Sequence, residues 1–297
     1  MRIFAVAITY HPDASMLTKV LHAIASQVQG IVVIDNGSRN AEEVCSIASA
    51  LGVQVVANKQ NLGIAKAQNQ GIKLAQAEDF SHILLLDQDT VLAPGVVADL
   101  ARNLANLEKE HGAVAAIGPA YYEVNSRQRT RAYRGSGPLL SRISVDKKMD
   151  PLASDFIIAS GSLIPLSVLE KVGEFKEELF IDLVDVEWCF RARAAGYRTF
   201  LCPTANVDHH LGSGTVYVGR RQIAVHAPVR NYYWVRNALW LARQYYTPLA
   251  WRIYLFSRCL AFLAVYTTMV DNRTFRFKLI VRGARDGLAG HLGQLEL

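Results

Sequence analysis

The chain has 297 residues, of which 51% are hydrophobic and 20% charged, and its formal net charge is +6. This length and apolar content can bury a sizeable core and exclude a disordered chain, while 20 Gly and 9 Pro exclude a fibrous or low-complexity protein. The 4 cysteines form no CxxC pair, which argues against a disulfide framework or a zinc site and favours a reducing, cytoplasmic compartment. The N-terminal apolar run meets Tyr10, His11 and Pro12 before it is long enough for a signal peptide, so we interpret it as a strand.

The first half of the chain alternates apolar, β-rich runs with segments of helical pattern. Strands are predicted at 3–10, 31–38, 53–58 and 82–89, and helices at 15–26, 41–51, 63–76 and 94–111. This alternation is typical of βαβ units, so we expect an α/β fold with a mainly parallel central sheet flanked by helices. Ligands of such sheets bind beyond the carboxyl ends of the strands, where three of these strands end in DNGS, AN and DQD.

The middle of the chain is less regular. A strand is predicted at 113–119, helices at 165–173 and 185–196, and a short strand at 197–208. Between them, residues 125–150 carry seven Lys and Arg together with several Gly and Ser, which indicates a mobile loop.

The charge is divided unevenly along the chain. Residues 1–219 hold 20 Lys+Arg and 23 Asp+Glu, a net of −3, whereas residues 220–297 hold 12 and 3, a net of +9. Eleven of those twelve basic residues are Arg, and three of the four Trp lie in the same tail. The change in composition predicts a boundary at residue 219, followed by a basic, aromatic-rich helical region.

The segment LLLDQDT (84–90) places two carboxylates, Asp87 and Asp89, at the end of an apolar strand. Hard divalent cations prefer oxygen ligands, and Mg²⁺ typically takes one or two carboxylates with phosphates and water. The pair is therefore a candidate site for a metal bound to a diphosphate. An isolated DxD is more often a solvated turn, because short motifs match by chance. Its position at the end of a strand in a βαβ chain favours the metal site.

Two further segments carry side chains able to do chemistry. FIDLVDVEWCFRARAAG (180–196) holds Asp182, Asp185 and Glu187 at or before the start of a helix, where they can cap the helix or supply a general base. VDHHLGSGT (207–215) holds His209, which in isolation reads as an ordinary loop histidine but can also complete a metal shell. The segment NLGIAKAQNQGI (61–72) is a weaker signal, of small and amide side chains at a loop–helix junction.

Several motifs are absent from the sequence. It contains no GxGxxG after the first strand, no GxxxxGK[ST], no HExxH and no GxSxG. These absences count against dinucleotide oxidoreductases, P-loop NTPases, zincins and α/β-hydrolases.

Seven segments, taken together and in order, resemble glycosyltransferase family 2, which has the GT-A fold. They are VAITYHP, VVIDNGS, NLGIAKAQNQGI, LLLDQDT, the SGS at 160–162, FIDLVDVEWCFR and DHHLG, and they span about residues 3–215. The DQD and FIDLVDVEWCFR segments are most similar to bacterial rhamnosyltransferases of polysaccharide (O-antigen or capsule) assembly. The resemblance implies that 1–219 is a GT-A catalytic domain that binds nucleotide sugar and acceptor.

The resemblance also implies roles for individual residues. Residues from four of these segments would bind the nucleotide sugar: Thr9, Tyr10, Asp35, Asn61, Gly63, Lys66 and Asp87. Asp89, with His209, would hold a Mg²⁺ or Mn²⁺ ion, and Asp185 falls where the family places its catalytic base. The usual family base segment reads Glu-Asp, whereas here it is Val184-Asp185, which leaves Asp182 as the alternative base.

The implied reaction is an inverting, metal-dependent transfer of L-rhamnose from dTDP-L-rhamnose. The implied acceptor is a glycan or a polyprenyl-diphosphate-linked saccharide in cell-surface polysaccharide synthesis. Two alternatives are the same fold with another nucleotide sugar and, from a different class, a non-catalytic scaffold that binds glycan or lipid. Glycoside hydrolysis also uses two carboxylates, but it explains neither the DxD nor the base-binding segments.

The tail, at 226–270, has a helical pattern rich in aromatics and Arg. Its longest uncharged run, 259–270, has 12 residues, and a transmembrane helix needs about 20, so no span is expected. One interpretation is helices packed on the catalytic domain, and another is an interfacial surface with Arg on anionic lipid. The two are compatible, and they place the protein in the cytoplasm, with peripheral binding at the inner face of the plasma membrane. Nucleic-acid binding ranks last, and we expect no nucleic-acid partner.

Overall fold

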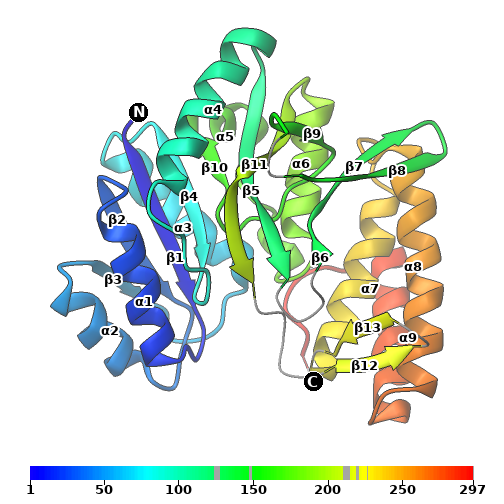
Figure 1. Cartoon of the computed structure of the whole chain (residues 1–297). Coiled ribbons are helices and arrows are strands. Elements are labelled where there is room, and N and C mark those ends of the chain that lie inside the picture. Colours follow the sequence, from blue (N-terminus) through cyan, green and yellow to red (C-terminus); the bar gives the residue numbers. More distant parts are fainter. Residues whose placement is uncertain (124–127, 147–148, 210–214, 219–220, 226, 297) are drawn as a thin grey trace.

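The computed structural model describes all residues except 124–127, 147–148, 210–214, 219–220, 226 and 297 (Figure 1). A nine-stranded sheet forms the centre of the described part, in the order β3-β2-β1-β4-β10-β5-β11-β9 with β6 paired to β5. Its strands are β1 (Ile3–Thr9), β2 (Gly30–Asp35), β3 (Gln54–Ala57), β4 (His82–Asp87), β5 (Val114–Glu123), β6 (Gln128–Arg129), β9 (Leu152–Ser154), β10 (Leu163–Pro165) and β11 (Arg198–His209). The helices beside it are α1 (Ala14–Ala25), α2 (Ala41–Ala50), α3 (Ile64–Ala77), α4 (Val96–His111), α5 (Leu166–Val172), the short η1 (Glu177–Leu179) and α6 (Val184–Ala194).

The sheet is mainly parallel, as the alternation of strands and helices predicts. β1 pairs in parallel with both β2 and β4, and β5 pairs in parallel with β11, while β10 runs antiparallel between β4 and β5. The register places Thr9 beside Asp35 and Ile8 beside Asp87. The polar ends of three predicted strands therefore meet at one edge of the sheet.

Alternating side chains of the strands build two cores, one on each face of the sheet. Phe4, Val6 and Ile8 of β1 face a cluster that includes α3, α5 and α6. Ala5 and Ala7 face the opposite cluster, with side chains of α1, α2 and α4. A two-residue period along one buried strand thus fixes two helical layers.

One predicted loop is instead a hairpin. Within 125–150, β7 (Arg131–Ser136) pairs antiparallel with β8 (Leu139–Ser144), so the expected mobile loop is wrong for these residues. The carboxylate of Asp155 connects the hairpin to the C-terminal region, because it accepts hydrogen bonds from Gly135 N (2.6 Å) and from Trp251 Nε1 (2.7 Å). Tyr133 is followed by Arg134, Gly135 and Ser136 with no apolar side chain among them, so β7 lacks the alternation by which strands are recognised.

The C-terminal tail forms three helices, α7 (Pro228–Ala242), α8 (Leu249–Thr268) and α9 (Arg273–Ala289), after a small ribbon of β12 (Thr215–Val218) and β13 (Arg221–Ala224). Side chains of α7 and α8 pack with Val186 and Phe190 of α6 in one cluster. Figure 1 shows the three helices as a layer beside the sheet, next to α6. The boundary expected at residue 219 falls outside the described residues and stays a prediction.

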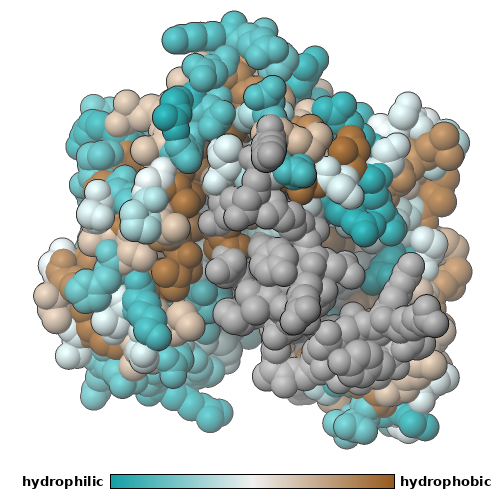
Figure 2. All heavy atoms as spheres, viewed as in Figure 1, coloured by the Kyte–Doolittle hydropathy of each residue, from teal (hydrophilic) through white to brown (hydrophobic). Residues whose placement is uncertain are grey.

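Helix α8 departs from the expectation of no membrane span. In the described part of the chain it is the one helix whose length and composition would let it cross a membrane, with a mean hydropathy of 1.3. Arg252 and Arg258 shorten its uncharged run without making the helix polar on average. Length and composition alone do not distinguish a membrane-spanning helix from a core helix of a soluble protein. Of the most apolar stretch of α8, 28% is buried inside the molecule. Figure 2 shows hydrophobic side chains along the outer edge of the molecule, over α8.

Candidate active site

A cavity of about 790 Å³ opens at the polar edge of the sheet. Its walls come from the ends of β1 and β4, the loop before α3, and the segments that precede β10 and α6. Seven of the predicted site residues line it together: Thr9, Tyr10, Asn61, Gly63, Asp87, Asp89 and Asp185. Residues that are up to 176 positions apart in the chain, from Thr9 to Asp185, therefore share one cavity.

The carboxylates of the DQD turn crowd one wall of this cavity. Burial, followed by the charges of Asp89 and Asp185, raises the pKa of Asp87 to about 7. The turn is fixed by Ser160, whose Oγ accepts a hydrogen bond from Asp87 N (2.8 Å) and donates one to Thr90 Oγ1 (2.8 Å). The SGS segment thus supports the acidic turn from the neighbouring loop.

Asp185 lies in the first turn of α6 and faces the same cavity. Its carboxylate accepts hydrogen bonds from Val186 N (2.8 Å) and Ala159 N (3.3 Å). Burial raises the pKa of Asp185 to about 6, although these backbone donors act to lower it, and the charge of Asp182 adds to the rise. A carboxyl group with a pKa near 6 can accept a proton at neutral pH.

Asp182 also lines the cavity, but an arginine occupies its carboxylate. Arg230, in the first turn of α7, donates to Asp182 Oδ2 from Nε (3.1 Å) and to Oδ1 from Nη2. Two parallel bonds of this kind make a bidentate pair. The two acids that the sequence left as alternatives therefore have different surroundings: Asp182 is paired with a cation, whereas Asp185 is held by backbone N–H groups.

The structure places two other predicted residues, Asp35 and Lys66, away from the cavity wall, and it does not describe the side chain of a third, His209. Asp35 is fully buried beneath it, where its carboxylate accepts from Thr9 Oγ1 (2.9 Å) and Ser38 N (3.0 Å). Lys66 points to Glu177, with its Nζ 3.6 Å from Oε2. His209 ends β11, and its side chain is outside the part that the structure describes.

Gln68 and Arg230 are among the cavity residues that sequence reasoning missed. Gln68 is buried on α3, and its Oε1 has no hydrogen-bond partner among the described residues. Such an orphaned acceptor is costly in a protein interior, and a ligand donor would satisfy it. Its place in the segment NLGIAKAQNQGI was the available signal. Arg230 had none, because 48 residues separate it from Asp182.

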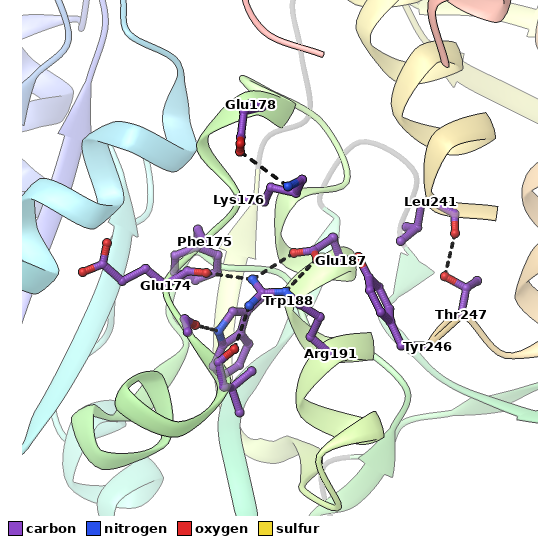
Figure 3. A network of polar contacts seen from close by, with 12 residues as sticks. Glu174, Phe175, Lys176, Glu178, Glu187, Trp188, Arg191, Leu241, Tyr246 and Thr247 are labelled. Carbon is purple, nitrogen blue, oxygen red and sulfur yellow. Dashed lines mark hydrogen bonds and ion pairs between the residues drawn. The ribbon is translucent and has the colours of Figure 1, made fainter. Parts of the chain in front are cut away.

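A second polar network fixes the body of α6 (Figure 3). Glu187 is fully buried, and its carboxylate accepts from Arg191 Nε (2.7 Å), from Arg191 Nη2 (3.0 Å) and from the Tyr246 hydroxyl (2.8 Å). The same Arg191 donates to the carbonyls of Val172 (2.8 Å), the last residue of α5, and Glu174 (2.7 Å), just after it. Figure 3 shows Arg191 between these two sets of partners, so the helix that carries Asp185 is tied to two neighbouring segments.

Comparisons with known proteins show the family to which the chain belongs. The family model for glycosyl transferase family 2 matches residues 5–173. The dTDP-rhamnosyl transferase RfbF of Shigella flexneri is 31% identical over 300 residues, which are 98% of this chain and 97% of that protein.

Solved structures show the same fold. S. aureus TarS 1-349 in complex with UDP-GlcNAc superposes with a TM-score of 0.61 at 14% identity, over 97% of this chain and 82% of that chain. S. aureus TarS 1-349 gives a TM-score of 0.58 at 15% identity, over 97% and 81%. The mainly parallel sheet and its flanking helices form the GT-A fold of a hexosyl-transferring enzyme. The chain belongs to glycosyltransferase family 2.

Proposed function

We propose that this protein transfers L-rhamnose, with inversion, from dTDP-L-rhamnose to a lipid-linked or oligosaccharide acceptor of cell-surface polysaccharide. The observation that carries the proposal is the cavity in which the paired acids of the DQD turn face Asp185, whose pKa is raised to about 6. The choice of rhamnose and of the thymine nucleotide in the donor is supported by the relative, a dTDP-rhamnosyl transferase that is 31% identical along nearly its whole length.

In this proposal Asp185, and not Asp182, is the catalytic base. An acceptor hydroxyl must lose its proton as it attacks the anomeric carbon, and a general base contributes typically 10²–10⁴-fold to such a step. Asp182 would have to give up its bidentate pair with Arg230 to take that proton. Asp185 has only backbone donors among the described residues, so it can take the proton without losing a charged partner.

The proposed cofactor is Mg²⁺ or Mn²⁺, held by Asp89 with Asp87 beside it. The two carboxylates fit such an ion, because burial and then the charge of Asp89 raise the pKa of Asp87, and a cation would offset both effects. The residues described contain no group of three or more His, Cys, Asp or Glu able to hold a metal, so phosphate and water would supply the other ligands. A bound divalent ion would neutralise the departing nucleoside diphosphate. His209 stays a predicted further ligand.

The proposed donor-binding residues surround these acids. The cavity is lined by Thr9, Tyr10, Asn61 and Gly63 together with Asp87. We propose that Thr9 and Tyr10 bind the nucleobase and ribose of the donor. Asn61 and Gly63 would lie near the nucleotide. Asp35 would contribute by fixing Thr9, through the hydrogen bond between them (2.9 Å). Lys66 can reach a nucleotide only by leaving Glu177.

The proposed location is the cytoplasm, with peripheral binding to the inner face of the plasma membrane. One face of α8 carries the exposed side chains of Leu249, Ile253, Phe256 and Leu260, which are between 49 and 56% accessible. Their spacing of four, three and four residues places them along one stripe of the helix. The tail has a net charge of +9, which complements anionic phospholipids, so this stripe and the surrounding Arg suit an interfacial helix.

A panel of sugar nucleotides tests the donor assignment. Thermal unfolding of the protein with Mg²⁺ or Mn²⁺ should be shifted upward most by dTDP-L-rhamnose, because a ligand that binds only the folded state stabilises it. The alternative donor class is supported by the TarS complex with UDP-GlcNAc. A larger shift with UDP-GlcNAc than with dTDP-L-rhamnose would select that alternative, and no shift with any sugar nucleotide would favour a non-catalytic scaffold.

A further inference from the structure

The segment that leads into α6 has an unusual backbone. Phe180, Asp182 and Leu183 have φ angles of +64°, +67° and +61°, in the left-handed region that residues other than Gly rarely adopt. This segment supplies one wall of the cavity and is followed within two residues by Asp185. Conformations of this kind persist only where the surrounding structure holds them, and they cluster at functional sites.

Helix α7 supplies the groups that hold this backbone. Asn237 is fully buried, and its Nδ2 lies 3.0, 2.8 and 2.8 Å from the carbonyl oxygens of Leu179, Ile181 and Asp182. The adjacent Arg236 is also fully buried, and its Nη2 donates to the carbonyl of Leu179 (2.8 Å). Irregular backbone leaves its carbonyls without partners, and buried carbonyls need them. Two consecutive side chains of α7 meet that need.

The two ends of the Asn237 side chain have separate tasks. Its Oδ1 accepts from Arg236 Nε (2.9 Å), which fixes the orientation of the amide, and the two N–H groups of its Nδ2 are shared among the three carbonyls. On the same helix, about two turns earlier, Arg230 donates hydrogen bonds to the carboxylate of Asp182. Helix α7 therefore controls both the backbone and one carboxylate of the segment 178–183.

We infer that Asn237 is a positioning residue for catalysis: it fixes the segment 178–183, which contains the three left-handed residues, and, through it, the placement of Asp185. The inference rests on the proposed function of Asp185 as the base. It assigns an active-site task to α7, which lies beyond the 5–173 matched by the family model. A general base must stay within hydrogen-bond reach of the proton that it takes, and a misplacement of about 1 Å can cost roughly 100-fold in rate.

Two substitutions at Asn237 test this task. Asn237→Ala removes the amide, and Asn237→Asp keeps the shape and the bond from Arg236 but replaces the donating end by a carboxylate oxygen that faces the three carbonyls. Asn231 provides a matched control on the same helix, because it is also buried but uses its Oδ1, which accepts from Arg276 Nη1 (2.5 Å). Asn231→Asp therefore keeps the bond from Arg276, whereas the same change at Asn237 loses the donation to the three carbonyls.

The first readout is amide hydrogen exchange, which reports local opening. We expect faster exchange confined to 178–185 in both Asn237 variants and the wild-type rate there in Asn231→Asp. This readout needs no substrate, so it stands even if the donor or the base is wrongly assigned. Exchange of 178–185 at the wild-type rate in the Asn237 variants would overturn the inference.

The second readout is the release of dTDP from dTDP-L-rhamnose. We expect kcat to fall roughly 100-fold in the Asn237 variants, while KM for the donor stays close to wild type because β1 and β4 form the opposite wall of the cavity. An equal loss of kcat in Asn231→Asp, or a loss carried by KM alone, would contradict a positioning role. If Asp185→Asn itself keeps full activity, the base assignment fails, and the exchange result still decides whether Asn237 holds the segment.

Discussion

Carboxylates that lie close together in the cavity differ because their immediate partners differ. Burial and neighbouring charges raise the pKa of Asp87 to about 7, and burial raises that of Asp185 to about 6. Asp182, three residues before Asp185, is instead paired with Arg230. The division of tasks that we propose, a metal pair and a separate base, follows from these partners and not from the residue type.

Asp185→Asn should keep donor binding and lose transfer, by roughly 10²–10⁴-fold in kcat, because the amide cannot accept the proton. The wild-type rate should rise with pH through about 6, since only ionised Asp185 acts as base, and this limb should vanish in the variant. Calorimetry of donor binding and a pH profile of kcat measure the two effects. Asp182→Asn serves as the comparison. A wild-type rate in Asp185→Asn together with an inactive Asp182→Asn would make Asp182 the base instead of Asp185.

The ionisation of Asp87 predicts how metal binding depends on pH. Its pKa lies above the ordinary 3.8, so its contribution to fold stability is fully present in acid and is lost as pH rises towards 7. A divalent cation would stabilise the ionised form of Asp87 in place of the proton. Because the cation and one proton compete for this carboxylate, affinity for Mn²⁺ should fall roughly tenfold per pH unit below about 7. Calorimetry with Mn²⁺ measures this, and Asp89→Ala should abolish the binding. A pH-independent affinity, or an unchanged one in Asp89→Ala, would count against the site.

At the scale of elements, the buried network of α6 predicts a large effect on stability. Arg191→Ala leaves Glu187 buried without its cationic partner, and this should lower the free energy of unfolding by about 3–5 kcal/mol. Arg102→Ala breaks a solvent-exposed pair with Asp99 and should cost at most about 1 kcal/mol. Chemical denaturation of both variants measures the difference, and equal losses would mean that the network around Glu187 is not what fixes α6.

The elements that sequence patterns predicted well are those with a simple period. The apolar runs at 3–10 and 82–89 became β1 and β4, and the helix predicted at 185–196 became α6 at Val184–Ala194. The hairpin of β7 and β8 was missed because Arg and Gly interrupt its alternation. The antiparallel placement of β10 was missed for another reason: three residues show no period of their own.

The cavity was predictable in part. The acids of the DQD turn and Asp185 stand in recognisable segments, so the resemblance found them. The pairing of Asp182 with Arg230 and the grip of Asn237 on the segment 178–183 depend on how α7 packs. No local pattern encodes contacts between residues 48 or more positions apart, and composition showed only that the tail is basic and aromatic.

For the whole molecule, the net charge of +9 on residues 220–297 belongs mostly to the helices beside the catalytic sheet. The tail combines buried polar side chains that serve the cavity with an exposed apolar stripe on α8. The protein should co-sediment with vesicles that contain phosphatidylglycerol at low salt and not with phosphatidylcholine vesicles. Phe256→Ser with Leu260→Ser should weaken that binding several-fold. Binding equal to wild type in this double variant would place the lipid contact elsewhere, and no binding of the wild type would refute it.

The release of dTDP from dTDP-L-rhamnose by the purified protein tests the central claim most directly. We expect release that requires Mg²⁺ or Mn²⁺, exceeds the release of UDP from UDP-GlcNAc, and falls roughly 10²–10⁴-fold in Asp185→Asn. Faster turnover of UDP-GlcNAc, or metal-dependent release that is unchanged in Asp185→Asn, would contradict the proposed donor or the proposed base, respectively.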